Sequence, residues 1–131
     1  MESYFSTYTG NDLSAAEQFR RLSEVSQSFR PQFIAPTFDG AWTNSGTPFA
    51  LAGYYKDPFE RVWLQGRVTG GTAGTLIFTL PLGFRVLDQD RVFIALSNSV
   101  VGSIEVLANG NVRAGIYSTW ISLDGISFAA V

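Results

Sequence analysis

The hydrophobic pattern of the chain changes near Pro31. Before that residue, four apolar side chains recur at spacings of 3, 3 and 4, which places them along one stripe of an α-helix. These residues are Phe19, Leu22, Val25 and Phe29. Ser14 and Glu17 form a capping box in front of the stripe, and Pro31 limits its continuation. We therefore predict a short helix within an N-terminal segment, residues 1–36, that ends in an extended linker.

A single helix of this length is marginally stable alone in water, so its apolar stripe requires a partner. The stripe can pack on the rest of its own chain, bundle with the same helix of two other copies, or dock into a larger assembly. The extended sequence from Phe33 to Pro36 favours the last two alternatives, because it carries the helix away from the following domain. We expect these four residues to anchor or trimerise the protein.

The remainder, residues 37–131, consists of short β-branched and aromatic runs separated by turn residues. Eight runs of this kind predict strands over residues 40–43, 50–56, 61–68, 75–80, 91–97, 103–108, 111–114 and 119–128. Asn109-Gly110 predicts a type I′ hairpin turn, and Asp124-Gly125 predicts either a second hairpin or a bulge in one continuous strand. We expect an all-β domain, a jelly-roll-like antiparallel β-sandwich, behind the helix.

Composition removes several classes of function. The chain has 131 residues, 9 basic and 11 acidic side chains, and neither histidine nor cysteine. The usual zinc ligands, thiol nucleophiles and a Ser-His-Asp triad are therefore excluded. Basic residues form no patch for nucleic acid, and no apolar stretch approaches the ~18 residues of a membrane helix. We expect no enzyme activity, no cofactor, no metal, no nucleic-acid partner and no membrane insertion.

The low charge adds a positive expectation. Only 15% of the residues are charged while 46% are hydrophobic. Such a surface is either covered by other copies of the chain or built from uncharged polar residues. We expect self-association.

Aromatic residues are the candidate ligand-binding side chains. Tyr54 and Tyr55 are neighbours in a predicted strand, so one of them can face solvent, and Trp120 follows a loop-like segment. These three residues are a possible glycan-binding set, whereas Trp42 and Trp63 are expected in the core.

The densest charged cluster contains Arg85, Asp88, Asp90 and Arg91. A calcium site or a carboxylate pair is conceivable at Asp88 and Asp90, but a solvated loop with internal ion pairs is the favoured interpretation.

Several motifs in the second part occur together. They are the aromatic-Lys-Asp segment from Tyr54 to Asp57, the Gly-rich loop from Gly70 to Gly74, the Thr79-Leu80-Pro81-Leu82-Gly83-Phe84-Arg85 turn, and the Leu123-Asp124-Gly125-Ile126 finish. Over residues 42–128 this pattern resembles the C-terminal β domains of bacteriophage tail-fibre, receptor-binding and head-fibre proteins.

The resemblance implies a homotrimeric β-sandwich without catalytic activity, located in the virion, where it contacts other virion proteins. The function expected from it is that of a trimeric fibre or decoration protein, with the N-terminus anchored to the particle and the β domain facing outward for host attachment. The alternative is a carbohydrate-binding module that recognises a host surface glycan through exposed aromatic residues.

Overall fold

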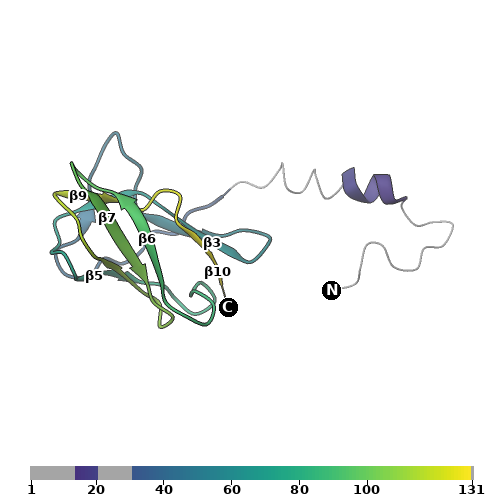
Figure 1. The fold of residues 1–131 in the computed structure, drawn as a ribbon. Helices are drawn as coiled ribbons and strands as arrows, with labels where there is room; N and C mark the ends of the chain where they lie inside the picture. The colour runs from purple at the N-terminus through teal and green to yellow at the C-terminus, as the bar shows by residue number, and fades with distance from the viewer. Residues whose placement is uncertain (1–13, 21–30, 131) are drawn as a thin grey trace. The chain divides into compact units, whose positions relative to one another are not determined.

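The computed structural model describes residues 14–20 and 31–130. The chain divides into two compact units, residues 1–31 and residues 32–131. In Figure 1 the strands all belong to the second unit, which we call the β unit. The predicted linker from Phe33 to Pro36 falls within this unit, where Ile34 forms an antiparallel bridge with Tyr54.

The first unit contributes a helical segment, residues 15–20. Ser14 caps it as expected, because its side-chain oxygen accepts a hydrogen bond from the backbone N–H of Glu17 at 3.2 Å. Phe19 is 64% exposed. Leu22, Val25 and Phe29 lie outside the described residues, so the packing of the predicted stripe stays a prediction.

The β unit contains three antiparallel sheets, which confirms the all-β expectation. One sheet has the strand order β1-β4-β9, the second β10-β3-β2, and the third β5-β8-β7-β6. The bounds of the strands are β1 Thr43–Asn44, β2 Gly53–Lys56, β3 Arg61–Gln65, β4 Arg67–Thr69, β5 Leu76–Thr79, β6 Arg91–Leu96, β7 Val101–Val106, β8 Asn111–Ala114, β9 Trp120–Ser122 and β10 Ser127–Ala129.

Two predicted strands are each divided between two sheets. The predicted strand 61–68 breaks at Gly66, whose φ of 107° separates β3 from β4. Opposite it, β9 and β10 flank Asp124 and Gly125 but pair with β4 and β3 rather than with each other, so the second hairpin is wrong. The alternative, a bulged strand, describes the geometry: residues 123–126 oppose only residues 64–66. The Asp124 Oδ1 atom fixes this bend by accepting the Gly66 N–H at 2.7 Å.

The hairpin at Asn109-Gly110 forms, but its turn differs from the prediction. Gly110 has a φ of 98°, whereas Asn109 is not among the residues with positive φ, as a type I′ turn would require. The connection spans residues 107–110 and is closed by a hydrogen bond from Leu107 N–H to the Asn111 carbonyl. The pairing of Val106 with Val112 follows, as the sequence predicts.

One core joins the sheets of the β unit. Tyr54 of β2 stacks on Phe78 of β5 at 6.4 Å between ring centroids, and Phe93 of β6 lies 6.5 Å from Phe128 of β10. Residues 80–90 connect β5 to β6, which lie at opposite edges of the same sheet. The Pro81-Leu82-Gly83 turn therefore begins a long crossover rather than a tight link between paired strands, although Gly83 has the expected positive φ of 91°.

The Gly-rich loop between β4 and β5 packs against Trp42. A Cβ atom on Gly71 would lie 2.0 Å from the indole ring, so only glycine fits there. The Trp42 indole N–H donates to Thr75 Oγ1 at 2.9 Å, and the Tyr117 hydroxyl donates to the Gly71 carbonyl. The expected core position of Trp42 is confirmed by its 4% exposure.

Candidate functional sites

The proposed glycan-binding aromatics do not converge on one surface. Tyr54 is buried beside Phe78 and Phe84, and burial raises the pKa of its hydroxyl. Tyr55 points to the other side of β2, where its half-buried ring meets the edge of Phe33 at 4.5 Å between centroids. Trp120 belongs to another sheet. Because Tyr54 is buried, it cannot form part of a glycan-binding platform.

Trp120 is part of a stack rather than an open platform. The Arg67 guanidinium lies 4.2 Å from the centroid of Trp120 and 3.5 Å from that of Phe49. Such cation–π contacts hold the indole face against the protein. Trp120 is the first residue of strand β9. In the loop-like segment before Trp120, Ser118 forms an isolated β-bridge with Trp120.

Trp63 does not take the expected core position: it is half-buried and is held by Asp57 in the turn between β2 and β3. The Asp57 Oδ2 atom accepts the indole N–H at 3.0 Å, and Oδ1 accepts the backbone N–H groups of Phe59 at 2.8 Å and Arg61 at 3.0 Å. Burial acts to raise the pKa of Asp57, but the hydrogen bond from Trp63, the two backbone hydrogen bonds and the charge of Arg61 outweigh it, so the pKa is lowered. The Asp57 carboxylate therefore stabilises the turn between β2 and β3 and the orientation of the Trp63 indole.

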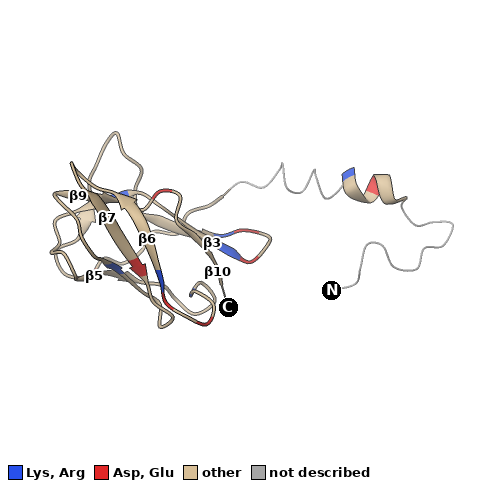
Figure 2. Cartoon of the chain, in the orientation of Figure 1, with Lys and Arg blue, Asp and Glu red and all other residues tan. Residues whose placement is uncertain are grey.

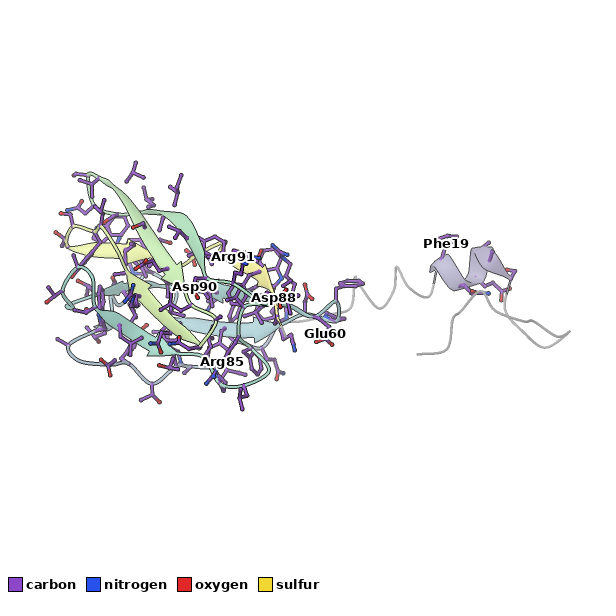
Figure 3. All side chains as sticks on the ribbon, turned by 60° about the horizontal axis from the view of Figure 1, so that its bottom comes forward. Phe19, Glu60, Arg85, Asp88, Asp90 and Arg91 are labelled. Atoms are coloured by element: carbon purple, nitrogen blue, oxygen red, sulfur yellow. The ribbon has the colours of Figure 1, made fainter. Side chains whose placement is uncertain are left out.

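The charged cluster gathers at one end of the β unit, as Figure 3 shows for Arg85, Asp88, Asp90 and Arg91. The expected internal ion pairs do not form between these residues. Asp90 Oδ1 accepts the Ala108 N–H at 2.7 Å, and Arg85 Nε donates to the Leu80 carbonyl at 2.9 Å. Within residues 14–20 and 31–130, no group of three acidic side chains is placed to hold a metal ion.

Asp88 differs from the rest of the cluster. Its φ is 68°, and the Gln89 N–H returns to the Leu87 carbonyl at 2.9 Å, so Asp88 is the central residue of a three-residue γ-turn. Strained backbone of this kind is uncommon for a residue with a side chain and is concentrated at functional positions. The turn is fixed to β10, because the Leu87 N–H donates to the Ala129 carbonyl at 3.0 Å.

Beside this turn is a hollow of about 320 Å³ between β10 and β6, which are edge strands of different sheets. Arg61, Asp88 and Arg91 bring charge to it, while Phe93 and Phe128 form apolar wall. The Arg61 guanidinium donates to Ser127 Oγ at 2.9 Å and to the Ser127 carbonyl at 3.2 Å, and Arg91 donates to the Gln89 and Asp90 carbonyls. We call this hollow the arginine pocket.

A second unusual surface covers the outer side of β6 and β7. Five aliphatic side chains there are each at least 67% exposed: Val92, Ile94, Leu96, Val101 and Ile116. We call these residues the aliphatic face. Cross-strand pairing places Leu96 opposite Val101 and Ile94 opposite Ser103. The carbonyl and N–H of Ile116 bond to Ser103, which places Ile116 at the border of the face.

Charge is confined to one end of the same sheet, as the colours in Figure 2 show around β6 and β7. There Glu105 forms an ion pair with Arg113 at 3.0 Å. The aliphatic face was missed at the level of sequence, although a signal was present. Every residue of β6 after Arg91 is apolar, so the strand carries apolar side chains on both of its faces. This pattern is typical of a strand that is covered on both faces.

Among the described residues, no helix is long and apolar enough to cross a membrane. A scan of protein-family models and searches among curated proteins and among solved structures found no match.

Proposed function

We propose that this chain is a non-enzymatic structural protein of a bacteriophage particle, a homotrimeric fibre or decoration protein. In this proposal the β unit is a jelly-roll-like sandwich that faces outward, and the N-terminal segment with Phe19, Leu22, Val25 and Phe29 anchors the protein to the virion. The virion assignment is supported by the resemblance of residues 42–128 to phage appendage domains.

The observation that carries the proposal is the aliphatic face. Full burial of one aliphatic side chain contributes roughly 1.5–3 kcal/mol, so five that remain in water forgo a large stabilisation. Contiguous apolar patches of this kind mark interaction surfaces on soluble proteins. A protein whose task is assembly has a use for such a surface.

The occupant that fits best is another copy of the same chain. The five residues of the face are aliphatic, with Ser103 opposite Ile94 and Glu105 opposite Val92 at the charged end, so most of the face complements itself without charge pairing. The face lies on the edge strand β6, which pairs with β7 along its length on one side only. Closed cyclic symmetry leaves no free end, and the trimer that the resemblance implies is one closed assembly of this kind.

Sedimentation measures the assembly directly. The full chain is expected at a mass near three times the 14.3 kDa of one copy at micromolar concentration. Residues 32–131 alone should give the same multiple, because the whole aliphatic face belongs to the β unit. A monomer in both preparations would contradict the proposal, and a monomer only in the shorter one would assign trimerisation to the N-terminal segment.

The virion assignment has its own test. Antibodies raised against residues 32–131 should label purified phage particles at fixed positions, and they should not label particles that lack this gene. Absence of the protein from particles would refute a virion role while leaving the assembly result intact.

A second candidate function, recognition of a host surface glycan, is favoured by the arginine pocket rather than by Tyr54, Tyr55 and Trp120. Host attachment through the β unit is compatible with the structural role.

A further inference from the structure

We propose that the arginine pocket binds a saccharide that carries a carboxylate, a hexuronate residue. The inference goes beyond an assembly role and does not depend on it. Strand β6 alternates its side chains, so Arg91 and Phe93 turn toward the pocket while Val92 and Ile94 belong to the aliphatic face. The two surfaces are therefore on opposite sides of one strand.

The charges of the pocket select an anion. Neither Arg61 nor Arg91 forms an ion pair with a carboxylate within 4.0 Å among the described residues, where the ion pairs are Lys56 with Glu60 and Glu105 with Arg113. Asp57 interacts with the charge of Arg61 from the turn between β2 and β3, outside the pocket lining. A guanidinium donates charge-assisted hydrogen bonds to carboxylates, and two guanidiniums on opposite walls can share one carboxylate.

Asp88 narrows the choice to a ligand with hydroxyl groups. Its carboxylate accepts no hydrogen bond from any described residue, and the γ-turn holds it at the pocket. A carboxylate repels phosphate and other compact dianions, but it readily accepts hydrogen bonds from sugar hydroxyls. A monoanion with neighbouring hydroxyls satisfies the two arginines and Asp88 together.

The walls and the size of the pocket agree with one sugar ring. The half-buried Phe93 offers apolar surface for the C–H face of a pyranose, the buried Phe128 lies behind it in the core, and Ser127 adds a hydroxyl. The volume of about 320 Å³ is at the lower end of the range of about 300–1,000 Å³ for small-ligand sites. A single residue of a longer polysaccharide therefore fits, with the remainder of the chain in solvent.

The test uses methyl glucuronide and its neutral counterpart methyl glucoside, titrated into the ¹⁵N-labelled full chain and followed by NMR. The glucuronide should shift the resonances of Asp88, Arg91 and Phe93 and saturate with a Kd on the order of 1 mM, as expected for a single small polar ligand. The glucoside should bind at least about tenfold more weakly, because it makes no charge-assisted hydrogen bond. Equal binding of both sugars, or no shift at these residues, would overturn the proposal.

Arg91→Gln should weaken glucuronide binding about tenfold or more, because one of the two charged donors is lost. Arg113→Gln is the matched control: it removes the same charge from the outer side of the sheet and should leave the Kd unchanged. An equal loss of glucuronide affinity in both variants would assign binding to the net charge of the protein and would contradict a site in the arginine pocket. Thermal unfolding of both variants checks that they fold.

Asp88→Asn and inorganic phosphate separate a saccharide site from a simple anion site. The unaltered protein should bind phosphate more weakly than the glucuronide, and Asp88→Asn should reduce this preference, since a repelling charge is removed. Phosphate that binds the unaltered pocket as tightly as the glucuronide would overturn the saccharide assignment.

Discussion

The outer side of the four-stranded sheet has a polar half and an aliphatic half. Around β7 and β8 it carries Glu105 and Arg113 as an ion pair, with Asn111 accepting a hydrogen bond from the Thr79 hydroxyl. Across β6 and the start of β7 it carries the aliphatic face. Both halves cover the same buried inner layer, so folding of the sheet does not explain the difference. The polar half suits contact with water, and the aliphatic half suits contact with protein.

The largest expected effect is on the free energy of unfolding, from a substitution in the buried inner layer of the four-stranded sheet. Ile104 is fully buried on β7, between the outward positions Ser103 and Glu105. Ile104→Ala should lower the free energy of unfolding by about 2–5 kcal/mol, because it removes buried methyl groups and leaves a cavity. Urea unfolding of the β unit, residues 32–131, measures this loss. A change below about 0.5 kcal/mol, typical of surface sites, would mean that the inner layer is not a packed core.

Adding the same charge to each half tests whether only the aliphatic half takes part in self-association. Ile94→Asp places a carboxylate at the centre of the aliphatic face and should weaken self-association by about 100-fold or more, about 2.8 kcal/mol, as a charge buried at an interface is costly. The measurement is sedimentation across a concentration series.

Asn111→Asp is the matched control on the polar half, because it adds the same charge and keeps the acceptor for Thr79. It should leave association unchanged. Equal weakening by the two variants would show that the face is not a specific contact.

The smallest effect concerns pH. No residue of the aliphatic face titrates, whereas the pKa of Asp57 is lowered in the folded protein. A lowered pKa means that the carboxylate stabilises the fold above its unfolded pKa of about 3.9, and that this contribution is lost as the pH falls through the folded value. The free energy of unfolding should therefore decrease below about pH 4.

Asp57→Asn should remove part of this acid sensitivity. At pH 7 it should cost about 1–2 kcal/mol, because the amide cannot reproduce the charge-assisted hydrogen bonds to Trp63 and the turn. Urea unfolding of both forms at pH 7 and pH 3 measures the difference. An identical acid response would show that Asp57 is not the group responsible.

Sequence patterns located most strands of the β unit, because their boundaries are set locally by turn residues such as Gly110 and Gly83. Pairing is set by distant contacts, and the errors lie there. Gly66 is a local signal for a bend within the strand, but the change of sheets at that residue is fixed by Asp124, which is distant in the sequence. The same limit explains why Asp124-Gly125 was open to two interpretations.

The candidate sites were harder to predict than the fold. The exposure of Tyr54 depends on Phe78 and Phe84, which reach it from other strands and loops. The charged cluster at Asp88 was identified, but its relation to Arg61 required the pairing of β10 with β3. The strand over residues 91–97 was predicted, but the exposure of its aliphatic side depends on what covers the sheet, which the composition of β6 does not specify.

The alternation of β6 has a consequence for how such a protein can diversify. Point substitutions at positions 91 and 93 change the pocket side of the strand, and those at 92, 94 and 96 change the other side, so each surface can vary without the other. An insertion or deletion of one residue within β6 would instead exchange the two sides. Lineages of this protein should therefore vary the exposed positions of β6 while keeping the buried Ala95 small and apolar and the length of the strand constant.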